Sequence, residues 1–288
     1  TYTLTATATD RAGNVSPDSP SFNLTIDTAK PTAPLAFTVT DNVLPGTGGV
    51  TSGSTINDTR PVLTGAAGSV EGNALVSGYD GTTLLGTTRA LADGSWAFTP
   101  LLALGNTAHA LSITATDAAG NVSDNSPVFN VTVDTVAPVT PGVMTVTDDA
   151  GTIVGPVTNG GVTDDILPLL SGTVEPGATV KIYDNGVLLT TVTADGTTGA
   201  WTFQTTTDLQ PGPHSLYVTA TDAAGNVSLP SPVFGFTVDT TAPPPIPAFT
   251  VTDDISPVTG TLASGDFTND NKPTIAGLGA TPGATVII

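Results

Sequence analysis

The residues of this sequence that could do chemistry are aspartates and asparagines in repeated positions. The segment Asp-Ala-Ala-Gly-Asn begins at Asp117 and again at Asp222, and a near copy begins at Asp10. These starting points lie about 106 residues apart, the size of one small domain, so the sequence repeats itself. Oxygen-bearing side chains that recur in every repeat suit a repeated binding site better than a single catalytic centre.

A second set of acids brackets a long glycine-rich loop in each repeat, here called the AB loop (residues 41–58, 148–165 and 253–270). In the middle repeat this loop starts at Asp148-Asp149 and ends at Asp164-Asp165. Turns rarely need Asp-Asp at both ends. The equivalent positions are Asp41, Asn42, Asn57 and Asp58 in one neighbouring repeat and Asp253, Asp254, Asn269 and Asp270 in the other.

Strand direction determines where these acids meet. Because successive strands alternate in direction, the AB loop of one repeat and the end of its last strand lie at the same end of the domain. The next repeat brings to that end its FG loop, the segment that starts with the repeated Asp (residues 10–14, 117–121 and 222–226). Carboxylates that converge there would repel one another. Calcium takes about 6 to 8 oxygen ligands at roughly 2.3–2.6 Å and would turn this repulsion into a clamp.

We therefore expect calcium at the junctions between repeats. The best-defined site combines Asp41, Asn42, Asn57, Asp58 and Asp134 with Asp222 and Asn226 of the next repeat, and its two AB-loop asparagines predict weaker binding. The other candidate ligands are Asp148, Asp149, Asp164, Asp165, Asp239, Asp27, Asp117, Asp253, Asp254 and Asp270. The alternative is that Asp and Asn are ordinary turn residues, and that the FG-loop Asp caps its own loop.

The elements that must position these loops are short strands. In the middle repeat, alternating or apolar runs predict seven strands, with an Asn185-Gly186 hairpin signal between two of them. The expected strands cover residues 143–147, 167–174, 179–183, 187–192, 201–203, 214–221 and 232–239. Seven strands with Greek-key-like spacing predict an all-β chain of immunoglobulin-like sandwiches.

Proline-containing breakers divide the repeats, and they begin at Asp27, Asp134 and Asp239. They predict two whole domains, at residues 30–136 and 137–241. Residues 1–29 correspond to the last two strands of a domain and residues 242–288 to its first three. Neither partial unit can bury its apolar face alone, so we expect each to be poorly ordered or completed from outside the chain.

Composition narrows the function. The 288 residues carry 25 acids against 6 bases, a formal charge of −19, which disfavours nucleic acid and anionic membrane surfaces as partners. Cysteine is absent, which removes disulfides and thiolate chemistry. No apolar run reaches membrane-spanning length and no signal peptide opens the chain. Because Thr1 falls in the middle of a strand pattern, we interpret the chain as a segment of a longer, disulfide-free extracellular array.

Catalytic patterns are not found in the sequence. His109 and His214 occupy equivalent positions and are expected to be edge or turn residues; no triad, nucleophile elbow or phosphate loop is recognisable. Trp96 and Trp201 could stack on a sugar, but Phe98 and Phe203 share their faces, so core packing is the expectation.

The motifs Thr-Asp-Ala-Ala-Gly-Asn-Val-Ser, Val-Asp-Thr-x-Ala-Pro, Thr-Asp-Asp and Tyr-Asp-Asn-Gly occur in this order and period. Together they resemble the bacterial Ig-like repeats of giant biofilm-associated adhesins, including those with RTX-type export signals. The resemblance implies type I secretion, a bacterial surface location, and calcium at the inter-domain junctions. Asn42, Asn57 and the stretch 43–51 depart from the pattern.

The sequence thus predicts a non-enzymatic, monomeric stalk that is stiffened by calcium and supports adhesion and biofilm formation. Its partners would be calcium ions and neighbouring repeats, with any host or matrix receptor bound by other regions. One alternative is a module that itself binds carbohydrate or protein. The other is an accessory segment of a secreted enzyme.

Overall fold

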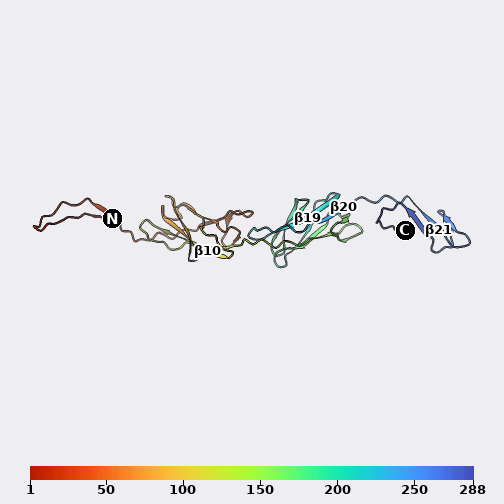
Figure 1. Ribbon diagram of the computed structural model, residues 1–288, viewed down its shortest axis with the longest axis horizontal. Helices are drawn as coiled ribbons and strands as arrows, with labels where there is room; N and C mark the ends of the chain where they lie inside the picture. Colours follow the sequence, from red (N-terminus) through yellow and green to blue (C-terminus); the bar gives the residue numbers. More distant parts are fainter.

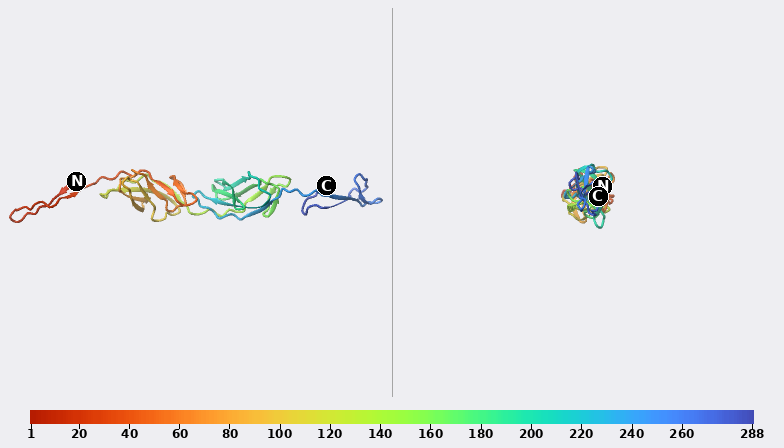
Figure 2. Two further views of the ribbon diagram at one scale, coloured as in Figure 1. Left: turned by 90° about the horizontal axis from the view of Figure 1, so that it is seen from above. Right: turned by 90° about the vertical axis from the view of Figure 1, so that its right-hand side faces the viewer.

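The computed structural model describes all residues, 1–288, and consists of strands and loops in a row of four units (Figures 1 and 2). Two sandwiches occupy the centre, and a smaller sheet lies at each end. In the end-on view of Figure 2 the units overlap within one compact cross-section, so the molecule is an extended rod. No helix that could span a membrane is present in the structure.

The first sandwich packs a four-stranded sheet, in the order β4-β3-β6-β9, on a five-stranded sheet, in the order β5-β11-β10-β7-β8. Buried side chains from both sheets form its core, among them Val39, Leu63, Leu111 and Ile113. Its strands are β3 (Thr38–Asp41), β4 (Gly48–Val50), β5 (Thr55–Ile56), β6 (Val62–Gly65), β7 (Leu75–Asp80), β8 (Thr83–Arg89), β9 (Trp96–Phe98), β10 (Ala108–Thr116) and β11 (Phe129–Val133).

The second sandwich repeats this topology with sheets β13-β12-β15-β18 and β14-β20-β19-β16-β17. All seven predicted strands are present. Its strands are β12 (Thr145–Asp148), β13 (Gly155–Pro156), β14 (Gly161–Thr163), β15 (Leu169–Thr173), β16 (Thr179–Asp184), β17 (Val187–Thr193), β18 (Ala200–Gln204), β19 (Gly212–Thr221) and β20 (Phe234–Val238). Asn185 and Gly186 adopt positive φ in the β16–β17 hairpin, as the Asn-Gly signal requires.

The AB loops contain structure that the sequence did not predict. In the second sandwich, β13 pairs with β12, and β14 then runs parallel to β20 in the opposite sheet. The loop therefore crosses from one sheet to the other. This crossing brings both ends of the loop to the exit of the last strand, because Asp239 donates its backbone N–H to the carbonyl of Thr163 at 2.9 Å.

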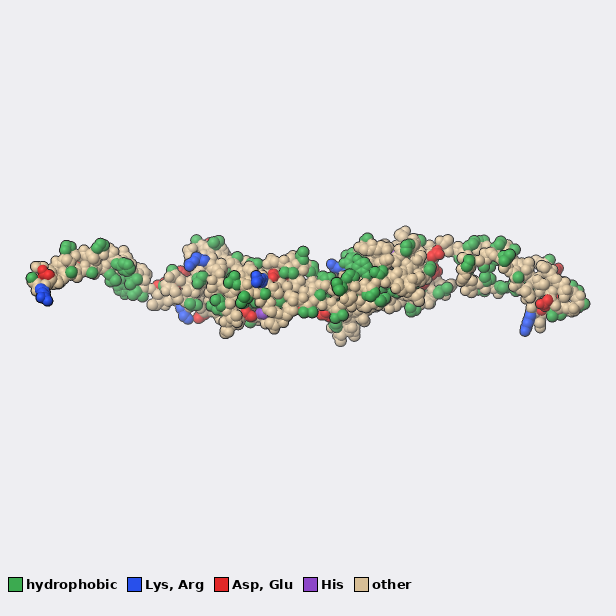
Figure 3. Space-filling view, in the orientation of Figure 1, with side chains coloured by type: hydrophobic (Ala, Val, Ile, Leu, Met, Phe, Trp, Pro, Cys, Tyr) green, Lys and Arg blue, Asp and Glu red, His purple; other side chains and the backbone are tan.

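Residues 1–29 form the expected two strands, whereas residues 242–288 form the first two of the expected three, with an unpredicted short strand in the AB loop between them. Residues 1–29 contribute a hairpin of β1 (Tyr2–Leu4) and β2 (Phe22–Leu24), and residues 242–288 contribute a sheet of β21 (Ala248–Asp253), β22 (Gly260–Leu262) and β23 (Thr274–Leu278). Large apolar side chains remain exposed in both, including Phe22 and Phe249. Figure 3 shows hydrophobic side chains along both ends of the rod.

The tryptophans pack in the cores, as predicted. Trp96 and Trp201 are each only 4% exposed, and each indole lies against a glycine of the neighbouring strand. A Cβ on Gly65 would lie 2.1 Å from Trp96 Nε1, and one on Gly172 would lie 2.9 Å from Trp201 Cζ2. Glycine is therefore required at both positions.

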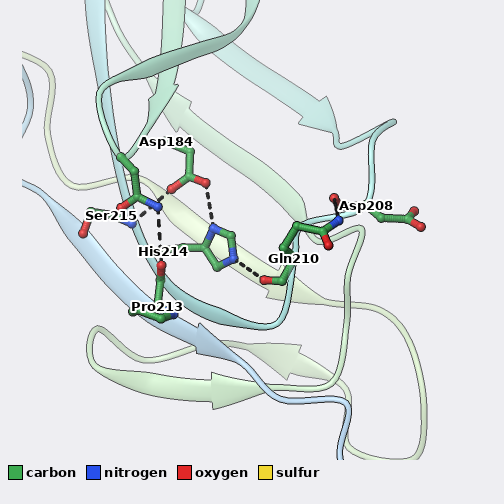
Figure 4. A network of polar contacts seen from close by, with 7 residues as sticks. Asp184, Asp208, Gln210, Pro213, His214 and Ser215 are labelled. Carbon is green, nitrogen blue, oxygen red and sulfur yellow. Dashed lines mark hydrogen bonds and ion pairs between the residues drawn. The ribbon is translucent and has the colours of Figure 1, made fainter.

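The expectation for the histidines was wrong. His109 and His214 lie buried in the central strands β10 and β19, at 7% exposure each. His214 Nδ1 is 2.7 Å from Asp184 Oδ2, and its Nε2 is 2.8 Å from the carbonyl of Gln210 (Figure 4). The same contacts join His109 to Asp80 and to the carbonyl of Gly105, at the same distances. Each histidine ties the loop before its strand to the strand beside it, which is a structural role.

Candidate metal centre

Each AB loop closes through the same pair of buried aspartates, and the repetition is seen in all three copies. In the second sandwich Asp148 and Asp165 are 7% and 2% exposed. The backbone N–H of Asp149 donates to Asp165 Oδ2 at 3.1 Å, which joins the two ends of the loop. The equivalent bonds run from Asn42 N to Asp58 Oδ2 at 3.0 Å and from Asp254 N to Asp270 Oδ2 at 3.4 Å.

These aspartates also serve as ordinary turn residues. Asp41 Oδ1 accepts the backbone N–H of Val43 at 2.8 Å, and Asp58 Oδ1 accepts that of Arg60 at 2.7 Å. Asp134, Asp239 and Asp27 cap the linkers in the same way, each through a bond of 2.9 Å from the N–H two residues on. These hydrogen bonds agree with the alternative that the aspartates are ordinary turn residues. Each carboxylate nevertheless keeps lone pairs that could bind a cation.

The electrostatics of the AB loops are unbalanced. The ion pairs of the structure join Lys30 to Asp124 and the two histidines to their aspartates, so none involves an AB-loop acid. Burial, together with the nearby Asp58 charge, raises the pKa of Asp41 above its ordinary value. Burial and the neighbouring Asp165 raise the pKa of Asp149 in the same direction. Keeping the AB-loop carboxylates ionised therefore costs free energy when no cation is bound beside them.

The middle junction brings two sandwiches into contact. Its groove, of about 390 Å³, is lined by Asp41, Gly46 and Ile56 of the first sandwich and by Asp222 and Gly225 of the second. Gly225 packs closely enough that a Cβ there would lie 3.8 Å from Asn57 Nδ2. Asn57 Oδ1 is buried in this contact without a hydrogen-bond partner. An oxygen in that state is a ready cation ligand.

The FG loop donates its hydrogen bond across the junction through its asparagine, whereas its aspartate lines the groove and holds that asparagine. Asp222 Oδ1 accepts the backbone N–H of Asn226, and Oδ2 accepts its side-chain amide, both at 2.8 Å. The same amide donates across the junction to the carbonyl of Asp134 at 2.9 Å. Asp117 is held in the same way by Asn121, whose hydrogen bond lowers the pKa of Asp117. This geometry matches the self-capping alternative for Asp117 and Asp222.

The predicted ligands therefore fall into groups. At the middle junction Asp41 lines the groove and Asn57 lies beside Gly225, whereas Asp58 closes the AB loop through the backbone N–H of Asn42, whose side chain is exposed. In the second AB loop, Asp148, Asp164 and Asp239 line one groove of about 430 Å³ with the exit linker. In the third AB loop, the hydrogen bonds of Asp253, Asp254 and Asp270 repeat only the closure of the loop. Across the structure, no three Asp, Glu, His or Cys side chains form a ready metal cage.

Comparisons with known proteins identify the family to which the chain is similar. The family described as "Bacterial Ig-like domain" matches residues 35–135 and 140–240. Exoglucanase B of Cellulomonas fimi is 30% identical over 239 residues; that alignment spans 83% of this chain and only 20% of the exoglucanase.

Two solved structures are among those to which the chain is similar. Fibronectin(III)-like modules of Clostridium thermocellum CbhA are 17% identical, with a TM-score of 0.41 over 70% of this chain and 94% of theirs. A Ca²⁺-stabilized adhesin of an Antarctic bacterium that binds ice is 24% identical, with a TM-score of 0.38 over 88% of this chain and 59% of its own. The family match covers most of the sequence in two consecutive copies. The chain therefore belongs to the bacterial Ig-like domain family.

Proposed function

We propose that this chain is a stalk segment of a bacterial surface adhesin, and that calcium bound at its domain junctions stiffens it. The observation that carries the proposal is the middle junction. There the buried Asp41 lines the groove and the buried Asp58 closes the same AB loop, neither with a basic partner, and the unpartnered Asn57 Oδ1 belongs to a side chain that lies beside Gly225 of the next sandwich.

The donor chemistry fits calcium, a hard cation that prefers carboxylate, amide and backbone oxygens. Because acids alone do not complete a cage, Asn57, backbone carbonyls and water would supply the remaining ligands. Bound calcium would neutralise the buried carboxylates. The second AB loop, with Asp149 and Asp164 where the first has Asn42 and Asn57, would bind the ion more tightly because it offers more charge.

A stalk uses this chemistry for stiffness. The first two of the three junctions already have a polar bond, from Asn121 and from Asn226, to the preceding linker. Calcium would fix the AB loop at the same place and restrict bending, so that a tip elsewhere in the parent protein is held away from the cell. In this proposal the segment is extracellular, exported by type I secretion and monomeric, and it supports adhesion and biofilm formation while other regions bind the receptor.

Calcium titration of the full chain tests the proposal. Isothermal calorimetry on protein stripped with chelator should give saturable binding, and the melting temperature should rise with calcium because only the folded state holds the ion. Asp58→Asn should weaken calcium binding at the middle junction by about tenfold or more. Asp208→Asn, at an exposed position outside the AB and FG loops, should leave the titration unchanged. Absence of binding heat and of any melting shift would refute the calcium proposal.

A second candidate is supported by the sequence likeness to Exoglucanase B of Cellulomonas fimi. Here the same modules would space the domains of a secreted enzyme that acts on polysaccharide. The two candidates share the stalk mechanics and differ in the parent protein. Hydrolysis of cellulose by the purified parent would favour the enzyme, and cell-surface immunolabelling of intact, non-hydrolysing bacteria would favour the adhesin.

A further inference from the structure

The outer face of the five-stranded sheet of the second sandwich carries the one basic side chain of that sandwich. Alternation of buried and half-buried residues in β16 and β19 leaves one side of each strand facing away from the core. Cross-strand pairing places these residues in rows with those of β17. The outward residues are Thr179, Lys181, Tyr183, Leu188, Thr191, Thr193, Ser215, Tyr217, Thr219 and Thr221, and none of them is acidic.

Two tyrosines lie at the centre of this face. Tyr183 and Tyr217 are directly opposite each other on neighbouring strands, and their rings stack with centroids 4.8 Å apart and planes 9° apart. Leu188, which is 48% exposed, pairs with Tyr183 on its other side. Figure 3 shows hydrophobic side chains gathered on this sandwich. In a parallel stack, each ring keeps one face that its partner does not cover.

One cation accompanies the tyrosines. Lys181 is the only lysine or arginine between residues 140 and 240, against ten Asp and Glu. It lies two residues from Tyr183 on β16 and is paired with Thr191 and Thr219. The single positive charge of the module is thus placed beside its aromatic pair, on a sheet face whose outward residues include no acid.

The first sandwich provides an internal comparison. Tyr79 occupies the place of Tyr183, but Ser112 stands opposite it, and Ser77 occupies the place of Lys181. The fold of this family therefore needs neither the second tyrosine nor the lysine. Their presence in one repeat alone points to a role other than stability.

We propose that the face formed by Tyr183, Tyr217 and Lys181 binds an acidic polysaccharide. Aromatic rings offer flat apolar surfaces on which the C–H face of a pyranose can rest, and the flanking threonine hydroxyls can exchange hydrogen bonds with its hydroxyl groups. Lys181 complements a carboxylate on the sugar, which selects a uronate chain over a neutral one. The second sandwich would then be a weak lateral contact with a matrix glycan as well as a spacer.

Nuclear magnetic resonance of the full chain tests this proposal with a hexameric uronate oligosaccharide and, as the neutral probe, cellohexaose. The uronate should shift the ring signals of Tyr183 and Tyr217 in chelator, where calcium cannot bridge protein and sugar. Tyr217→Ser, which reproduces the pairing of the first sandwich, should raise the uronate Kd at least tenfold while the sandwich remains folded. Lys181→Ala should remove the preference for uronate.

Several outcomes would overturn the proposal. Binding of neither probe would do so, as would equal binding of both with no effect of Lys181→Ala. If wild type sediments as a dimer that Tyr217→Ser dissociates, the face is instead a contact between copies of the chain. Should Tyr217→Ser fail to fold, Lys181→Ala still decides, because loss of uronate selectivity supports the assignment and its retention contradicts it.

Discussion

The side-chain amide of Asn226 donates a 2.9 Å hydrogen bond to the backbone carbonyl of Asp134, the residue at which the preceding sandwich ends. The donor belongs to the FG loop of one domain and the acceptor to the linker of the other. Because Asp222 holds the same amide at 2.8 Å, the donor is oriented before the domains meet. The junction is therefore built from backbone carbonyls and a pre-positioned amide, with the AB-loop acids beside them.

Replacement of Asn226 should loosen the middle junction alone. Asn226→Ala removes the bond to Asp134, so the two sandwiches should reorient more freely while each keeps its fold. Residual dipolar couplings measure this, since two rigidly joined sandwiches share one alignment tensor. The matched control is Asn121→Ala, which removes the corresponding bond to Asp27 at the upstream junction. If the tensors remain equal in Asn226→Ala, the amide does not hold the domains.

The acids of the AB and FG loops should respond to pH with opposite signs in chelator. The folded-state pKa of Asp149 is raised, so its protonation favours the fold, and that contribution is lost as pH rises through the folded pKa. Asp149→Asn should thus stabilise the chain above the folded-state pKa of Asp149 and have little effect below the ordinary aspartate pKa, about 3.9.

Asp117 provides the opposite case. Its folded-state pKa is lowered by the Asn121 amide, so its contribution is present above the ordinary aspartate value and is lost as pH falls through the folded pKa. Asp117→Asn should therefore destabilise the first sandwich at neutral pH and become neutral in strong acid. Melting curves of both variants from pH 2.5 to 7 check the two signs; parallel curves for both variants would contradict the electrostatic interpretation.

Much of this architecture can be predicted from short local segments of the sequence. The seven predicted strands of the second sandwich follow from alternating residues and from turn dipeptides such as Asn185-Gly186, which act within a few residues. The crossing of β13 and β14 inside the AB loop was missed, because two- and three-residue strands with Gly and Pro carry no periodic signal. The parallel pairing of β14 with β20 joins Gly161 to Phe236, far away in sequence.

The candidate site was predictable in its location but not in its roles. The repeated acids indicated which loops meet, whereas the division between Asp222 as a loop cap and Asn226 as the bridging donor depends on side-chain geometry. The buried histidines were missed since a single residue has no period. The sequence did contain a signal, because each repeat has an Asp followed by a His at nearly the same separation. These pairs are Asp80 with His109 and Asp184 with His214.

The histidine contacts predict a stability difference between two nearby aspartates. Asp184 accepts from the backbone N–H of Ser215 at 3.1 Å and faces His214 (Figure 4). Asp184→Ala should cost roughly 2–3 kcal/mol, because it leaves a buried ring nitrogen and a strand N–H without a partner. Asp208→Ala, on the exposed loop nearby, should stay within about 0.5 kcal/mol. Urea unfolding measures both, and equal values would remove the proposed tie.

The tryptophan–glycine contacts predict which glycine substitution destabilises its sandwich more. Gly172→Ala and Gly65→Ala each drive a methyl group into an indole, so each should destabilise its sandwich by about 1–3 kcal/mol, with Gly65→Ala the more severe. The control is Gly196→Ala, where a Cβ meets nothing within 4 Å. Differential scanning calorimetry separates the two sandwiches. A neutral Gly65→Ala would show that the Trp96 pocket has space to relax.

The central claim, that calcium straightens the chain at its junctions, is tested most directly by electron spin resonance distances between the two sandwiches. The chain contains no cysteine, so spin labels can be attached at Thr87→Cys on β8 and Thr191→Cys on β17, both at exposed positions. The account predicts a broad distance distribution in chelator that narrows to a single population in calcium, and stays broad in calcium when Asp41 and Asp58 are both changed to Asn. Superimposable distributions with calcium and with chelator would contradict it.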